Sequence, residues 1–146
     1  MRKTLTALAL AAATLTGLPA QAEEARNLVT VVTSGDPQTQ LMSMVLTMQS
    51  VQQGASAQIL LCGPAGDLAL KEAPASATAP QKPKDMSPQR LMRMIMDKTG
   101  TKVEVCAIYL PNKGVDASAL LDGITAAQPP AMAAALMAEN TTVLSF

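Results

Sequence analysis

Four short apolar runs, each separated from the next by a stretch with helical character, constrain the fold of this chain more than any other feature. The runs cover 27–34, 57–63, 102–110 and 141–146. Strands that read as nearly continuous apolar segments are typical of parallel sheets covered on both faces. When such strands alternate with helices, the chain builds right-handed βαβ units. The sequence therefore predicts a small doubly wound, flavodoxin-like α/β fold, a three-layer α/β/α arrangement with a parallel sheet of four to five strands.

The segments between the strands carry start and stop signals for helices. Asp36 and Pro37 are a typical N-cap and first helical residue, and Gly54 is a typical stop signal. A helix is therefore predicted between them. The other predicted segments are a Pro- and Ala-rich loop over 71–85 and helices over 86–100, 116–124 and 129–139.

The first residues have the pattern of a secretory signal peptide. A basic Met-Arg-Lys start is followed by the apolar run "TLTALALAAATLTGLP" and by small residues at Ala20 and Ala22. Cleavage after Ala22 is predicted, which leaves one domain, 23–146, exported to a bacterial periplasm. The apolar run is shorter than the roughly 20 strongly apolar residues that a bilayer span needs. No membrane span is therefore expected after cleavage.

The composition argues against several classes of function. The chain has no histidine and no tryptophan, and only one tyrosine and one phenylalanine. Acid–base catalysis by histidine and zinc sites with histidine ligands are therefore excluded, and aromatic platforms for bases or flavins are missing. Basic and acidic residues balance without a basic cluster, so nucleic acid is not an expected partner. The segment "TSGDPQT" (33–39) lacks a P-loop lysine, and no cofactor is expected.

Two parts of the chain carry a family resemblance. The first is "VEVCAIYLPNKGVD" (103–116), a short strand with one cysteine, together with the later helices and the final strand "VLSF". The second is the opening strand, loop and helix "NLVTVVTSGDPQTQ". These features resemble the DsrE/DsrF-like family, which includes the sulfur-relay subunit TusD. The resemblance is best over 102–146, weaker over 27–63, and limited to the layout over 64–100.

The resemblance implies a compact domain that assembles into trimers or hexamers. It also implies that Cys106 accepts sulfane sulfur as a persulfide and exchanges it with a sulfur donor or acceptor protein. Lys113 is the candidate that stabilises the Cys106 thiolate, and Cys62 is a candidate accessory thiol. The relay members work in the cytoplasm, whereas this chain carries an export signal, so their tRNA-thiolation chemistry is not carried over. The segment that follows Cys106 also differs from theirs.

The residues themselves leave other interpretations of the cysteines open. A cysteine in an apolar strand is often a small buried hydrophobe, and two cysteines in an exported protein often pair. In the strand order expected for this fold, strand one lies between strands two and three. Cys62 and Cys106 would then stand two strand spacings apart, roughly 9–10 Å, beyond the roughly 7 Å limit for a disulfide. This geometry argues against a bridge.

Two alternatives to sulfur handling follow from these observations. The first is a non-catalytic oligomeric module in which Cys106 is merely buried. The second and lesser one is Cu(I) binding by the methionine-dense segments "MSMVLTM" (42–48) and "MRMIM" (92–96). Because their methionines recur at helical spacing, core packing explains them better, and no metal is expected.

Overall fold

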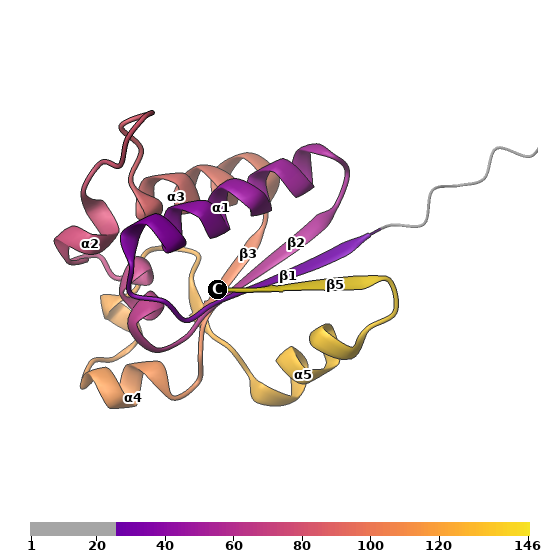
Figure 1. Ribbon diagram of the computed structural model, residues 1–146. Coiled ribbons are helices and arrows are strands. Elements are labelled where there is room, and N and C mark those ends of the chain that lie inside the picture. Colours follow the sequence, from indigo (N-terminus) through magenta and orange to yellow (C-terminus); the bar gives the residue numbers. More distant parts are fainter. Residues whose placement is uncertain (1–25) are drawn as a thin grey trace, which may run out of the picture.

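The computed structural model describes residues 26–146 (Figure 1). The predicted signal peptide and its cleavage site therefore lie outside the described residues. One parallel sheet has the strands β1 (Asn27–Val32), β2 (Ser56–Leu61), β3 (Lys102–Val105), β4 (Thr125–Ala126) and β5 (Thr141–Ser145). The α-helices are α1 (Pro37–Gln52), α2 (Ala75–Thr78), α3 (Pro88–Thr99), α4 (Tyr109–Lys113) and α5 (Pro129–Met137), and the 3-10 helices are η1 (Gly63–Ala69) and η2 (Ala117–Ala119).

The sheet is enclosed by two layers of helices. Figure 1 shows α1 and α3 side by side on one face, with α4 and α5 on the other. The five-stranded, all-parallel sheet between them confirms the predicted doubly wound, three-layer α/β/α fold class. None of the helices in residues 26–146 is both long and apolar enough to span a bilayer.

The strand order differs from the predicted one. The order is β4-β3-β2-β1-β5, so β2 lies between β1 and β3. The prediction that strand one lies between strands two and three was wrong. The reason is that α1 and α3 pack against each other on the same face. The first two crossovers therefore carry the chain in one direction across the sheet. Only α5, on the other face, returns it to the far side of β1.

Several element boundaries also differ from the prediction. The third strand ends at Val105 instead of continuing to 110, because the chain turns into α4 directly afterwards. The predicted helix over 116–124 is reduced to the short η2, and the segment 71–85 contains α2. Neither β4 nor η1 was predicted from the sequence. The predicted cap at Asp36 is confirmed, since it accepts a hydrogen bond from the Thr39 amide. Ser87 caps α3 in the same way by accepting one from the Arg90 amide.

The main core lies between the sheet and the α1/α3 layer. Its fully buried side chains include Met44, Leu61, Met92 and Ile95. A smaller apolar cluster, around Leu60 and Met132, lies under α5 on the opposite face. Burial of apolar side chains on both faces is the main stabilising term for such a sheet. The second face has a thinner cover, because the nine-residue α5 packs on it through Met132, Ala135 and Leu136 only.

Candidate functional site

Cys62 and Cys106 meet at the carboxyl ends of two adjacent strands. In the register of β2 and β3, Leu61 lies opposite Val105, and each cysteine directly follows one of these residues. The Cys106 amide donates to the Leu61 carbonyl at 2.8 Å, which continues the ladder to the cysteines. Ligands and reactive groups of open α/β sheets gather at this edge. Cys106 was predicted within a strand over 102–110, and it lies directly after the shorter β3 instead.

The two cysteines form a disulfide, with their Cα atoms 5.0 Å apart. The expectation that they stand too far apart for a bridge was wrong, because it rested on the wrong strand order. With β2 and β3 adjacent, one strand spacing of roughly 4.8 Å separates their backbones. Both cysteines are half-buried, so neither behaves as a fully buried hydrophobe.

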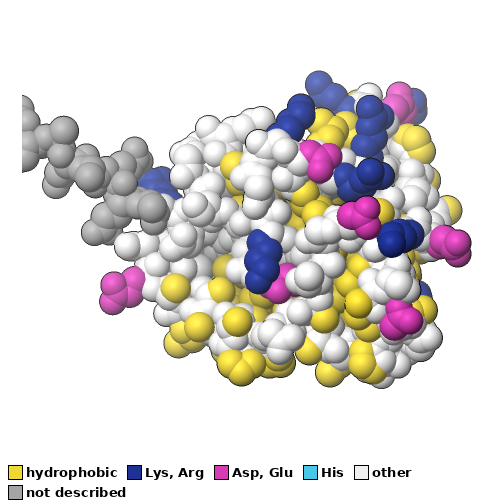
Figure 2. Space-filling view, turned by 180° about the vertical axis from the view of Figure 1, so that it is seen from behind, with side chains coloured by type: hydrophobic (Ala, Val, Ile, Leu, Met, Phe, Trp, Pro, Cys, Tyr) yellow, Lys and Arg dark blue, Asp and Glu magenta, His cyan; other side chains and the backbone are white. Residues whose placement is uncertain are grey.

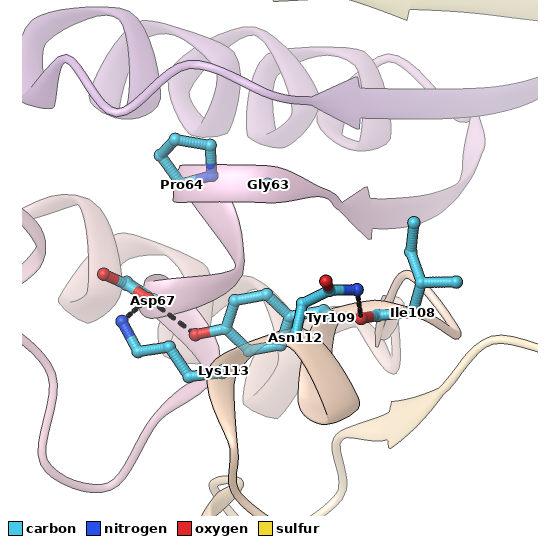
Figure 3. A pocket seen from close by; sticks show the side chains of 7 residues that line it. All are labelled: Gly63, Pro64, Asp67, Ile108, Tyr109, Asn112 and Lys113. Carbon is cyan, nitrogen blue, oxygen red and sulfur yellow. Dashed lines mark hydrogen bonds and ion pairs between the residues drawn. The ribbon is translucent and has the colours of Figure 1, made fainter.

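A cleft of about 430 Å³ lies between the segments that follow Cys62 and Cys106 in the chain, and Figure 3 shows the residues that line it. One wall begins directly after Cys62, with η1, and the other follows Cys106, with α4. The residues that line it are Gly63, Pro64, Asp67, Ile108, Tyr109, Asn112 and Lys113. Ile108 is a large apolar residue that is 71% exposed at the start of α4. The disulfide therefore ties together the two segments that form the cleft.

Asp67, Tyr109 and Lys113 join the two walls of the cleft. The Tyr109 hydroxyl donates to Asp67 Oδ1 at 2.6 Å, and the Lys113 ammonium binds the same oxygen at 2.7 Å (Figure 3). Burial, and then the hydrogen bond to the Asp67 carboxylate, raise the pKa of Tyr109 well above its usual range. The tyrosine therefore stays protonated and remains a hydrogen-bond donor at physiological pH.

This arrangement bears on the predicted role of Lys113. Within the described residues, the hydrogen bond and ion pair of its ammonium are with Asp67. A disulfide-bonded Cys106 does not ionise, so stabilisation of its thiolate by Lys113 stays a prediction. Asp67 and Tyr109 were not predicted as site residues. No pattern marked Asp67, since it lies in a short 3-10 helix, and Tyr109 was assigned to a strand.

The sheet face that continues from Cys106 toward the start of β3 is partly polar. Glu104 is only 5% exposed and lies one pleat before Cys106. Its carboxylate accepts a hydrogen bond from Gln58 Nε2 at 2.7 Å and pairs with the Lys102 ammonium at 2.8 Å. A buried charge is tolerated when it is paired and hydrogen-bonded in this way. The face that Glu104 shares with Cys106 is therefore incompletely apolar.

The methionine-dense segments belong largely to the core. Met44 and Met92 are fully buried, and Met48 and Met96 pack against the same cluster. This is the packing role that their helical spacing indicated. Among residues 26–146, no group of three or more His, Cys, Asp or Glu side chains is arranged to hold a metal ion.

Comparison with solved structures places the fold among known ones. The crystal structure of the ychN protein from E. coli superposes with a TM-score of 0.64 at 17% identity, covering 84% of this chain and 99% of the other. MTH1491 from Methanobacterium thermoautotrophicum, a protein of unknown function, superposes with a TM-score of 0.58 at 9% identity, covering 84% of this chain and 100% of the other. This chain therefore shares the fold of these two proteins.

Sequence comparison adds no closer assignment. No family model matches the chain, and no curated protein matches its sequence. At identities of 17% and 9%, the structural likeness establishes the fold and leaves activity to be argued from the site.

Proposed function

We propose that the protein handles sulfane sulfur through Cys106, with Cys62 as the resolving thiol. The observation that carries this proposal is the position of the two cysteines: paired, half-buried and beside a cleft at the carboxyl edge of the sheet. A disulfide that only stabilises the fold does not require a cleft beside it. The resemblance to the DsrE/DsrF-like family supports the same assignment, because it matches Cys106 with the sulfur-accepting cysteine of the relay members.

The proposed reaction starts from the dithiol form. The Cys106 thiolate attacks the sulfane sulfur of a donor persulfide, RSSH. The S–S bond of the donor breaks, the thiol RSH leaves, and Cys106 becomes a persulfide. An acceptor thiol can then take the outer sulfur. When none is present, the Cys62 thiolate attacks Cys106 Sγ, hydrosulfide leaves, and the Cys62–Cys106 disulfide forms. In that case the two thiols supply two electrons that reduce the sulfane sulfur to sulfide, and a dithiol reductant regenerates the protein.

Intact mass spectrometry of the reduced protein tests this proposal. After incubation with polysulfide, a Cys62→Ser variant is expected to gain the mass of one sulfur atom on Cys106, because the resolving thiol is gone. The wild type is expected to release sulfide and return to the disulfide form. A Cys106→Ser variant is expected to gain nothing.

Two outcomes would contradict the assignment. Sulfur uptake on Cys62 in the Cys106→Ser variant would reverse the roles of the two cysteines. If neither single variant takes up sulfur, while both react with a small alkylating reagent, the non-catalytic binding module becomes the better interpretation, and the disulfide is then a structural bond.

We further propose that the protein works as an exported homo-oligomer, a trimer or hexamer. The α4/α5 side has exposed apolar groups: Ile108 at the cleft, Val143 on the edge strand β5 and Met137 at the end of α5. Figure 2 shows apolar side chains along the lower edge of the molecule, where α4 and α5 lie, and mixed charges higher up. A small domain gains buried area by covering such a surface with a second copy.

Protein purified from a periplasmic extract tests export and assembly on one sample. Its N-terminal residue is expected to be Glu23, and light scattering is expected to give a multiple of the protomer mass. A chain that begins at Met1 would contradict export, and a monomer at micromolar concentration would contradict the assembly.

A further inference from the structure

We propose that the cleft beside the disulfide binds the α-amino-acid headgroup of a cysteine-derived persulfide or disulfide. This inference rests on the proposed function and names the class of small-molecule donor. The site consists of Asp67 and Lys113, with Pro64, Ile108 and Tyr109 as its apolar wall. One wall begins at Gly63, directly after Cys62, and the other at Ile108, two residues after Cys106. A ligand held there by its headgroup can therefore reach toward the disulfide with its sulfur.

Asp67 has an unused acceptor. Its Oδ1 atom accepts both the Tyr109 hydroxyl and the Lys113 ammonium, whereas Oδ2 has no hydrogen-bond partner among the described residues. The side chain is 22% exposed and lies in the wall of the cleft. A carboxylate can accept about four hydrogen bonds, so Oδ2 can receive the α-ammonium of a ligand without breaking either existing contact.

Lys113 has unused donors. Its ammonium has three N–H groups, of which one faces Asp67, and its side chain is 42% exposed. The remaining donors can bind a ligand carboxylate. The cleft therefore offers an acceptor for a cationic group, on Asp67, beside donors for an anionic group, on Lys113. Such a pair matches a zwitterion better than a ligand with a single charge. A cysteine within a polypeptide lacks both groups and would gain nothing from them.

The buried tyrosine makes this pair a fixed feature of the cleft. Tyr109 is 6% exposed, and its hydroxyl holds Asp67 in place. The ligand would therefore meet a carboxylate that is already positioned, and it would lose less free energy on binding than with a mobile partner. Pro64 and Ile108 offer apolar contact to the short side chain that leads to the sulfur.

Three symmetric disulfides test the headgroup site. Cystine carries both charged groups, cystamine lacks the carboxylate and dithiodipropionate lacks the ammonium. Each can oxidise the reduced protein by the same two steps. One protein thiolate attacks a sulfur of the reagent and expels one thiol, and the second protein thiolate then attacks the mixed disulfide and expels the other. The protein dithiol loses two electrons, and the reagent becomes two thiols.

We expect cystine to oxidise the protein about tenfold faster than either analogue. Each rate is first divided by the rate at which the same reagent oxidises free dithiothreitol. A charge-assisted hydrogen bond contributes about this factor. Asp67→Asn, which keeps an acceptor for Tyr109, should abolish the preference over dithiodipropionate. Lys113→Gln should abolish the preference over cystamine. Lys82→Gln, which breaks the remote Lys82–Asp85 ion pair, is the matched control and should change neither preference.

Equal normalised rates for the three reagents would overturn the inference, as would a preference that survives in both cleft variants. The test is separable from that of the proposed function. A protein that takes up sulfane sulfur without headgroup preference contradicts the site alone. A protein with the preference but without sulfur uptake contradicts the proposed function and keeps the site.

Discussion

Reduction of the Cys62–Cys106 disulfide is expected to lower the free energy of unfolding by about 3 kcal/mol. The two cysteines are 44 residues apart in the sequence. Their bond therefore closes a long loop that contains η1, α2 and α3, and it restricts the unfolded chain. Urea unfolding, monitored by circular dichroism with and without dithiothreitol, measures the difference. The folded state should survive reduction, because the main core on the α1/α3 face does not depend on the disulfide.

The matched control is the Cys62→Ser/Cys106→Ser double variant, whose stability should match that of the reduced wild type and should not respond to dithiothreitol. Equal stability of the oxidised and reduced wild type would contradict the prediction. The proposed cycle requires this difference to be smaller than the total stability, because the dithiol form must stay folded to accept sulfur.

The sequence was sufficient to predict the layers of the fold but not the order of the strands. The apolar runs and the cap at Asp36 are local signals. Each run contains a strand, and the cap is found where expected. Strand order depends on which face each crossover helix covers. That choice is made by packing between α1 and α3, which are far apart in the sequence. An error of one position in the order placed Cys62 and Cys106 on non-neighbouring strands and hid their disulfide.

Part of the candidate site could be predicted from the sequence, and the rest could not, because it depends on contacts between segments that are distant in the chain. The cysteines and Lys113 stand out by residue type, and Cys62 and Lys113 lie at or shortly after the end of an apolar run. Asp67 and Tyr109 become partners only because η1 and α4 lie side by side in the folded chain. The run "CAIYL" reads as strand by composition. It leaves the sheet after Val105, since the first backbone hydrogen bond of the turn already joins the Tyr109 amide to the Cys106 carbonyl.

Substitution of Gly66 by alanine is expected to lower the free energy of unfolding by about 2–3 kcal/mol. Gly66 is buried in η1, and the ring of Tyr109 packs directly on its Cα. A Cβ at this position would overlap the Cδ2 and Cε2 atoms of the ring and would lie 2.7 Å from Cζ. The ring cannot move away without cost, because Tyr109 is buried and its hydroxyl is held by Asp67. Thermal or urea unfolding of the variant measures the loss.

A double-mutant cycle with Tyr109→Ala separates this overlap from other effects of the substitution. Tyr109→Ala is destabilising by itself, since it empties a buried site. In that background, Gly66→Ala is expected to cost little, because the ring atoms that it meets are gone, and the two changes should couple by about 2 kcal/mol. An additive cycle would show that the tyrosine ring is not what requires glycine. Tyr109 is also the residue that positions Asp67, so the same close contact sets the shape of the cleft. Gly66→Ala should therefore also weaken the preference for cystine over its two analogues, although Gly66 contacts neither the disulfide nor the proposed ligand.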